Sequence, residues 1–248
     1  SEEGVPMDVS DQVFSIVTTN PPPADYALSF DGLNDFVSVA NHPSLNVSKK
    51  FTIEFWLKTD YPKQDYGRIL EKGSWDEYYM SFYNSTGKMC GALRVAFSGG
   101  TKMDTPIGPS QTIVIANKWY HFAATYDGST AKLYVNGLLE SSKTTTASPR
   151  SLAGDLIIGA VKRPGYLENH LKGILDELRI WNIERSSAEI TAAMFKTLQG
   201  DETGLVAYYT CNEGAGQVLG DLTAFHNHGR LGDTIAADDA DPVWIASD

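Results

Sequence analysis

The feature that most constrains this chain is a succession of short segments in which apolar and polar residues alternate. In residues 51–59, FTIEFWLKT, the apolar side chains of Phe51, Ile53, Phe55 and Leu57 recur at every second position. Successive side chains of a strand point to opposite faces of a sheet, so this spacing places all four on one face. Similar strand-like segments occur at 26–32, 35–40, 119–128, 131–137, 155–160, 171–181 and 204–214.

Turn and helix signals separate these strands. Asp127-Gly128 and Asn136-Gly137 lie between alternating segments, and both pairs tolerate the positive φ that tight hairpin turns require. One helix is predicted within 184–198, where Ser186 and Glu189 have the spacing of a capping box. Many short strands, one short helix and no βαβ rhythm predict an all-β, antiparallel sandwich.

Composition narrows the class of protein. The chain has 248 residues, of which 42% are hydrophobic, enough for the core of one large domain. The net charge of −11 disfavours nucleic acid and anionic membranes as partners, and it suits a divalent cation. No apolar run is long enough to span a membrane. Cys90 and Cys211 match no metal or redox motif, and the sequence leaves open a disulfide or two buried thiols.

The N-terminal region differs from the rest. Residues 9–17 are predicted to form a strand, and the three prolines within TTNPPPAD, 18–25, favour an extended linker. The chain begins SEEGVP without a methionine, so we expect it to be an excerpt of a longer precursor.

Four segments in order resemble a known family: ALSFDGLNDFVSV, FTIEFWLKT, KWYHFAATYDGSTAKLYVNG and LKGILDELRIWNIERSSAEI. Together they are similar to laminin G-like, concanavalin A-like jelly-roll modules, over roughly residues 26–197. This resemblance implies two antiparallel sheets packed face to face, carbohydrate or protein partners, a rim calcium ion and an extracellular location.

Domain boundaries follow from the same resemblance. Residues 7–16 resemble the last strand of a bacterial immunoglobulin-like module, so 1–22 are expected to end a preceding module and to include the linker. Residues 23–248 are expected to form the jelly-roll module. Its tail, 198–248, resembles a segment often attached to such modules and should belong to the same folding unit.

Adjacent carboxylates in GILDELRIWNI, 173–183, argue against an enzyme. A retaining glycosidase needs two carboxyl groups ~5 Å apart. Asp176 and Glu177 should point to opposite faces of their strand, and Glu54 has no acid two residues later. His121 and Tyr120 are also neighbours, which disfavours the Tyr/His pair of a lyase. The chain is therefore predicted to be non-catalytic.

A metal site is predicted at the end of the first jelly-roll strand. The turn that holds Asp31, Asn34 and Asp35 offers the hard oxygen ligands that calcium prefers. Calcium needs ligands from a second segment, and the resemblance places the start of DELRI nearby, so Asp176 is the candidate there. The alternative is that Asp31 and Asp176 only accept backbone N–H groups.

Two loops carry the aromatic and polar side chains that bind sugars, because ring faces pack on C–H patches while amides and acids take hydroxyl groups. The predicted ligand-binding residues are Tyr66, Arg68, Trp75, Asp76 and Tyr78 in the loop 60–79, with Tyr166 and Asn169 in 162–170.

The predicted function is a non-catalytic, extracellular, lectin-like or adhesion module that binds a polysaccharide or glycan and carries a structural calcium ion. It should be a monomeric module within a longer chain. The alternative is a structural spacer or protein-binding module of a large surface protein without sugar affinity. A polysaccharide hydrolase or lyase is the least favoured interpretation.

Overall fold

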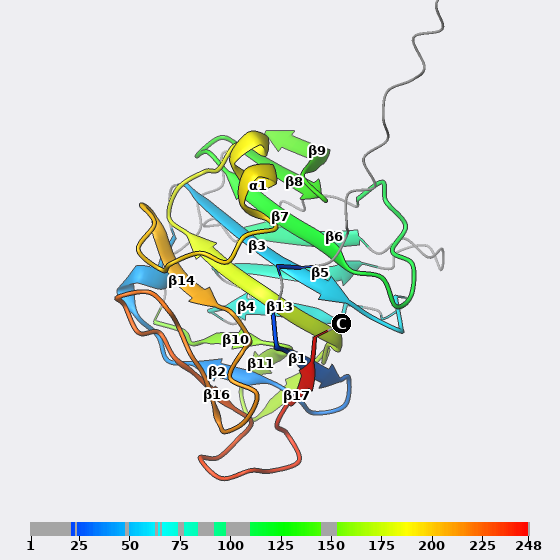
Figure 1. The fold of residues 1–248 in the computed structure, drawn as a ribbon, viewed down its shortest axis with the longest axis vertical. Coiled ribbons are helices and arrows are strands. Elements are labelled where there is room, and N and C mark those ends of the chain that lie inside the picture. Colours follow the sequence, from blue (N-terminus) through cyan, green and yellow to red (C-terminus); the bar gives the residue numbers. More distant parts are fainter. Residues whose placement is uncertain are drawn as a thin grey trace, which may run out of the picture.

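The fold is a sandwich of two antiparallel sheets (Figure 1). The computed structural model describes residues 21–22, 24–47, 50–62, 64, 66–73, 77–83, 92–97, 110–144 and 153–247. The strand predicted at 9–17 lies outside these residues. The sheet nearer the viewer in Figure 1 is called the front sheet, and the one behind it the back sheet.

Each sheet has a defined strand order. The front sheet runs β17 (Val243–Ala246), β1 (Tyr26–Asp31), β13 (Lys172–Trp181), β3 (Phe51–Lys58), β7 (Tyr120–Tyr126), β8 (Thr130–Val135) and β9 (Leu138–Thr144), and β14 (Leu205–Tyr209) also pairs with β13. The back sheet runs β15 (Val218–Leu219), β16 (Gly229–Leu231), β2 (Val37–Val39), β10 (Leu156–Ile158), β4 (Arg68–Lys72), β5 (Tyr78–Tyr83) and β6 (Ala92–Phe97). A hairpin of β11 (Val161–Arg163) and β12 (Tyr166–Glu168) stands apart from both.

The core fills the space between the sheets. Phe51, Ile53, Phe55 and Leu57 of β3 all belong to the main hydrophobic cluster, so the predicted face of this strand is confirmed. The back sheet contributes side chains such as Met80 to the same cluster. Such interdigitation of two inner faces is what stabilises a β-sandwich.

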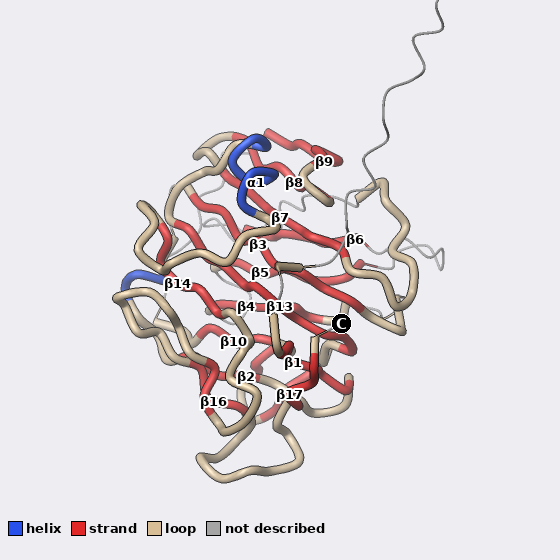
Figure 2. Tube along the Cα trace, viewed as in Figure 1, coloured by secondary structure: helices blue, strands red, loops and turns tan. Residues whose placement is uncertain are grey.

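The outer face of the front sheet is also covered. Helix α1 (Ser187–Ala193) lies over β7 and β8 in Figures 1 and 2, and its predicted capping box is present. The Trp56 indole nitrogen of β3 donates to the carbonyl oxygen of Met194, 2.8 Å away, just after this helix. This cover explains why all of β3 except Lys58 is buried, although only alternate residues face the core.

The predicted turns are confirmed. Asp127-Gly128 joins β7 to β8, and Asn136-Gly137 joins β8 to β9 with φ angles of 50° and 78°. A short 3-10 helix, η1 (Pro43–Leu45), was not predicted. The jelly-roll sandwich with one short α-helix is thus the observed fold of the described residues.

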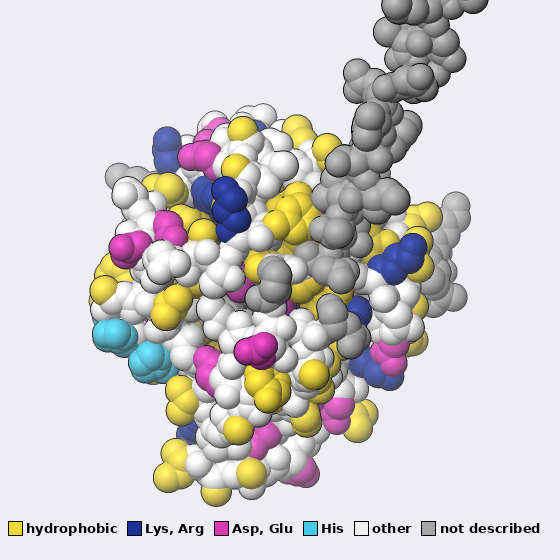
Figure 3. Space-filling view, in the orientation of Figure 1, with side chains coloured by type: hydrophobic (Ala, Val, Ile, Leu, Met, Phe, Trp, Pro, Cys, Tyr) yellow, Lys and Arg dark blue, Asp and Glu magenta, His cyan; other side chains and the backbone are white. Residues whose placement is uncertain are grey.

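The face drawn in Figure 3 mixes hydrophobic, basic, acidic and other polar side chains. On the face drawn in Figure 3, acidic side chains are scattered among hydrophobic and basic ones rather than gathered into one patch. No helix among the described residues is long and apolar enough to cross a membrane.

Candidate functional site

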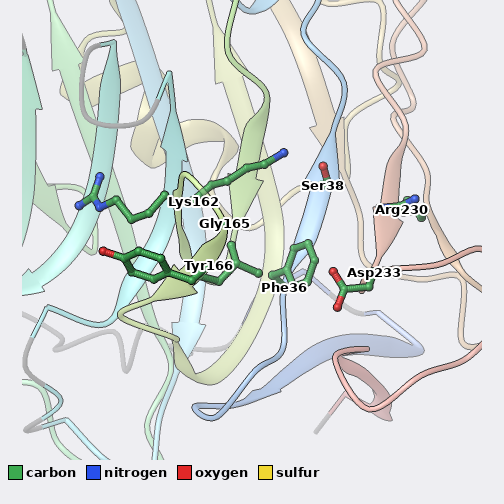
Figure 4. Close-up of a pocket in the computed structure, with 9 residues that line it drawn as sticks. Phe36, Ser38, Lys162, Gly165, Tyr166, Arg230 and Asp233 are labelled. Carbon is green, nitrogen blue, oxygen red and sulfur yellow. The ribbon is translucent and has the colours of Figure 1, made fainter.

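A hollow on the outer side of the back sheet is the strongest candidate for a ligand site (Figure 4). Its volume is about 380 Å³, which is the size range of small-molecule pockets. It is lined by Phe36, Ser38, Lys162, Arg163, Gly165, Tyr166, Leu167, Arg230 and Asp233.

Strands β2 and β16 form one side of this hollow. Val37, Val39 and Leu231 point into the core, so alternation turns Ser38 and Arg230 outward. The two are direct partners in the antiparallel register. The hydroxyl of Ser38 and the guanidinium of Arg230 therefore belong to one surface.

The β11–β12 hairpin forms the opposite side. Its two-residue turn, Pro164-Gly165, has Gly165 at φ 87°, a conformation that glycine adopts without strain. Leu167 packs on a small apolar cluster with Phe36 and Ile157, which anchors the hairpin to the sheet. Tyr166 is left 59% exposed at the rim.

Two ion pairs hold the basic side chains of this hairpin. The ammonium nitrogen of Lys162 lies 2.9 Å from a carboxylate oxygen of Asp155, and Arg163 Nε lies 2.8 Å from Glu168. Both pairs are partly exposed, so they orient the side chains more than they stabilise the fold.

The predicted sugar-binding residues divide into four groups, the last of which is the buried pair Arg68 and Tyr78. Tyr166 lines the hollow, and the Asn169 carbonyl accepts the backbone N–H of Arg68, at 2.9 Å, where the hairpin meets β4. Tyr66 is 39% exposed but is not part of the lining. Trp75 and Asp76 lie outside the described residues.

Two of these predictions are wrong, because the side chains are buried. Tyr78 is 1% exposed in the core between the sheets, where its hydroxyl donates to the Leu45 carbonyl. Arg68 is also 1% exposed, stacked 3.9 Å from the ring centre of Tyr79 and 3.6 Å from a carboxylate oxygen of Glu71. Neither side chain is open to a ligand at the surface of the described structure.

Sequence reasoning missed most of the hollow. Ser38, Lys162, Arg230 and Asp233 were not predicted, although alternation in 35–40 does place Ser38 opposite to the core. The other lining residues can be recognised only from the tertiary structure, because the hollow brings together strands and loops that are almost two hundred residues apart in the sequence.

The predicted metal ligands Asp31 and Asp35 lie together. A carboxylate oxygen of Asp35 accepts the Asp31 backbone N–H at 2.7 Å, and Asp31 accepts that of Leu33 at 2.7 Å. Burial raises the pKa of Asp35 to about 6, with further contributions from the charges of Asp31 and Asp241. Asn34 lies in the same turn and is partly exposed.

Asp176 does not join them. Asp31 pairs with Lys172 across β1 and β13, so Asp176 is four residues farther along the strand. At ~3.4 Å per residue that is about 14 Å, too far for one shared metal ion. Among the described residues, no group of three or more His, Cys, Asp or Glu side chains could hold a metal ion.

A β-bulge changes the directions predicted for Asp176 and Glu177. Between Asp176 and Arg179 the register of β13 against β3 gains one residue, and Glu177 has a φ of 52°. Asp176 is opposite Trp56 of the outer face, and Glu177 also turns outward to Tyr208. The prediction that these neighbours face opposite ways is therefore wrong, since a bulge breaks the alternation.

Glu177 and Glu54 belong to a buried charge network under α1. Glu177 accepts hydrogen bonds from Arg179 and, at 2.7 Å, from the Tyr208 hydroxyl. Glu54 pairs with Arg185 and accepts from the Trp181 indole at 2.9 Å. These acids are at most 1% exposed, so the network is closed to a substrate.

Asp176 itself is destabilising when charged. It is fully buried, and one of its carboxylate oxygens has no hydrogen-bond partner. Burial, and then the charge of Glu177, raise its pKa to about 8. A carboxyl group whose pKa is raised on folding makes the folded state bind the proton more tightly, so stability falls as pH rises from about 4 to about 8.

We therefore expect Asp176→Asn to be more stable than the parent at pH 8, by ~2 kcal/mol or more. The reason is that a tenfold difference in proton affinity between the folded and unfolded chain corresponds to ~1.4 kcal/mol, and an amide still accepts the Glu177 N–H. At pH 4 the advantage should vanish. Urea unfolding at both pH values measures this, with the exposed Asp201→Asn as the control. Equal pH slopes for parent and variant would contradict the assignment.

The comparisons with known proteins agree with this architecture. A laminin G-type profile of the Concanavalin A-like lectin/glucanases superfamily matches residues 31–191. The chain therefore belongs to the Concanavalin A-like lectin/glucanases superfamily. No curated protein sequence matches it.

Several solved structures share the fold. A putative carbohydrate binding protein from Bacteroides ovatus is 23% identical and superposes with a TM-score of 0.66. The match covers 89% of this chain and 61% of the Bacteroides chain. A second structure is Domain 4 of AbnA, an extracellular GH43 arabinanase from Geobacillus stearothermophilus, in complex with arabinotriose. It is 18% identical with a TM-score of 0.53, and the match covers 68% of this chain and 76% of that domain's chain. A SAP-like pentraxin from Limulus polyphemus is 16% identical with a TM-score of 0.51, and the match covers 68% of this chain and 81% of the pentraxin chain. The chain thus spans 61% of the length of the Bacteroides protein.

Proposed function

We propose that this protein is a non-catalytic, extracellular carbohydrate-binding module whose ligand occupies the hollow between β2, β16 and the β11–β12 hairpin. The observation that carries the proposal is Tyr166, 59% exposed at the rim of a polar hollow. An exposed aromatic ring offers a face to the C–H groups of a sugar, and the surrounding polar groups can take its hydroxyls.

The comparisons support the same function. One structural neighbour is described as a putative carbohydrate binding protein, and another was solved in complex with arabinotriose. Both neighbours are less than 25% identical to this chain. They support a saccharide as the kind of ligand, and an experiment is needed to identify which saccharide binds.

A glycan array followed by calorimetry tests the proposal. We expect Tyr166→Ala to weaken binding of any glycan found by about tenfold or more, since stacking of one aromatic ring is worth ~1.4 kcal/mol or more. The matched control is Tyr61→Ala, because Tyr61 is 50% exposed and outside the lining. Binding unaffected by Tyr166→Ala would refute the site, and no glycan binding would favour a spacer or protein-binding module.

Two features support a non-catalytic role. Glu54 of β3 and Glu177 of β13 are buried under α1 and pair with Arg185 and Arg179. Among the residues that the structure describes, Asp233 is the one acidic side chain lining the hollow, whereas glycosidases commonly need a pair. We expect no release of reducing ends or unsaturated products from polysaccharides that bind.

A calcium ion at the Asp31–Asp35 turn is a second part of the proposal. We propose Asp241 in place of Asp176 as the additional ligand, because the charge of Asp241 raises the pKa of Asp35 and one buried carboxylate oxygen of Asp241 has no hydrogen-bond partner. The described side chains do not form a ready-made cluster of three metal-binding groups, so Asp241 would have to move toward the turn for calcium to bind. Backbone carbonyls and water would have to complete its six to eight oxygen ligands.

Calcium should raise the melting temperature reversibly, because an ion that binds only the folded chain stabilises it by ~2.7 kcal/mol at a hundredfold excess over Kd. We expect Asp31→Asn and Asp241→Asn to reduce this response, while Asp176→Asn keeps it. Differential scanning calorimetry with calcium and with chelator gives the measurement. A parent chain that ignores chelator would eliminate the calcium site and leave the sugar site unaffected.

A further inference from the structure

The lining of the hollow has the opposite charge balance to the whole protein. The chain has 20 Lys and Arg against 31 Asp and Glu. Within the described part of the chain, the lining has Lys162, Arg163 and Arg230 against Asp233. Cations on the wall of a hollow attract anionic ligands, and those that are not already paired with an acidic side chain contribute most.

Arg230 is the cation in this lining that remains available. Lys162 and Arg163 are paired with Asp155 and Glu168. Arg230 is exposed, and among the residues that the structure describes its guanidinium has no hydrogen bond or ion pair. Its planar group carries donors in a fixed fork that matches a carboxylate.

The neighbours of Arg230 complete a polar recess. Ser38 is its direct partner across β2 and β16, so the hydroxyl lies on the same surface. In Figure 4, Ser38 and Arg230 lie on one side of Phe36, and the Lys162 side chain extends toward Ser38 from the other. Tyr166 closes the far rim, and Asp233 offers an acceptor for hydroxyl groups.

We propose that the hollow selects acidic saccharides, and specifically those with uronic acid residues, whose carboxylate is held by Arg230 and Ser38. A neighbouring sugar ring packs on Tyr166. This inference rests on the proposed carbohydrate-binding function and adds the chemical class of the sugar.

The experiment compares uronate tri- to hexasaccharides as free acids and as their methyl esters. The panel contains galacturonate, mannuronate and glucuronate oligomers, so one sugar ring does not decide the result. Esterification removes the charge and leaves the ring unchanged. We expect the free acid of at least one series to bind about tenfold or more tightly than its ester, and the affinity for the acid to fall with added salt.

Two variants with the same change of charge separate recognition from general attraction. Arg230→Gln should lower the affinity for the acid by about tenfold or more and leave that for the ester unchanged. Lys143→Gln, at an exposed position on β9 in the other sheet, should affect neither. Far-ultraviolet circular dichroism and melting temperature check that both variants fold.

Each outcome has a defined meaning. Equal binding of acid and ester, both weakened by Tyr166→Ala, overturns the acidic preference and leaves the carbohydrate-binding function standing. Equal losses in Arg230→Gln and Lys143→Gln overturn the role of Arg230. Binding of neutral glycans only refutes the inference, and binding of no glycan at all refutes the proposed function as well.

Discussion

Deletion of residues 198–248 is expected to produce an insoluble chain, or one without a cooperative unfolding transition. This segment supplies β14 beside β13 and β17 beside β1 in the front sheet, and β16 beside β2 in the back sheet. Removing it would leave β1 and β2 with unpaired edges, which invite aggregation.

The same deletion opens the core. Val206, Ala207, Tyr209, Leu219 and Leu231 belong to the main hydrophobic cluster, and each is at most 1% exposed. A buried aromatic or leucine side chain contributes ~2–5 kcal/mol, so losing several exceeds the roughly 5–15 kcal/mol that stabilises a typical domain. The loss should therefore be complete rather than partial.

Expression, solubility and calorimetric melting of the truncated chain measure the effect. Deletion of 243–248 alone serves as a graded control, because it removes only β17 at the edge of the front sheet and should lower the melting temperature without abolishing folding. A soluble 1–197 chain with unchanged melting would show that the tail is a separate unit.

Glu54→Gln is expected to destabilise the protein by ~3–5 kcal/mol, because it leaves the buried Arg185 without its anion and leaves Arg179 with Glu177 alone. Glu54 is fully buried, pairs with Arg185, and lies 3.7 Å from an Arg179 nitrogen and 3.7 Å from the His121 ring. Burial, together with the charges of the two arginines, holds the His121 pKa well below its usual value. The histidine is therefore neutral near pH 7, and the charge that Glu54 balances is that of the arginines.

A matched substitution at the surface tests that burial causes this cost. Glu184 pairs with Lys132 at 2.7 Å, but their side chains are 24% and 27% exposed. Glu184→Gln should change the free energy of unfolding by no more than ~1 kcal/mol. Urea unfolding of both variants at pH 7 makes the comparison, and equal losses would show that the Glu54 network contributes no more than a surface pair.

Local patterns predicted the architecture well because they act over a few residues. Alternation in 51–59 reflects the two faces of a strand, and the core side chains of β3 follow it. The capping box at Ser186 and Glu189 reflects hydrogen bonds made within one helical turn, and it forms as predicted. These features need no knowledge of distant segments.

The site was harder to predict, because its residues come from distant segments. Tyr166 could be selected as an aromatic residue between strands, but Arg230 becomes relevant only when β16 pairs with β2. Tyr78 was chosen for the same aromatic character, yet the register of β5 turns it into the core. The local sequence around an exposed tyrosine and that around a buried one do not differ enough to tell the two apart.

The sandwich, its turns and its helix cap could all be read from the chain, because hydrophobic periodicity and short-range hydrogen bonds depend on neighbouring residues. Which acids act together depended instead on how the strands pack. The bulge after Asp176 turned it and Glu177 to one face, and the β1–β13 register set Asp176 about 14 Å from Asp31. Bulges and strand register arise from packing between distant strands, so no local pattern reveals them.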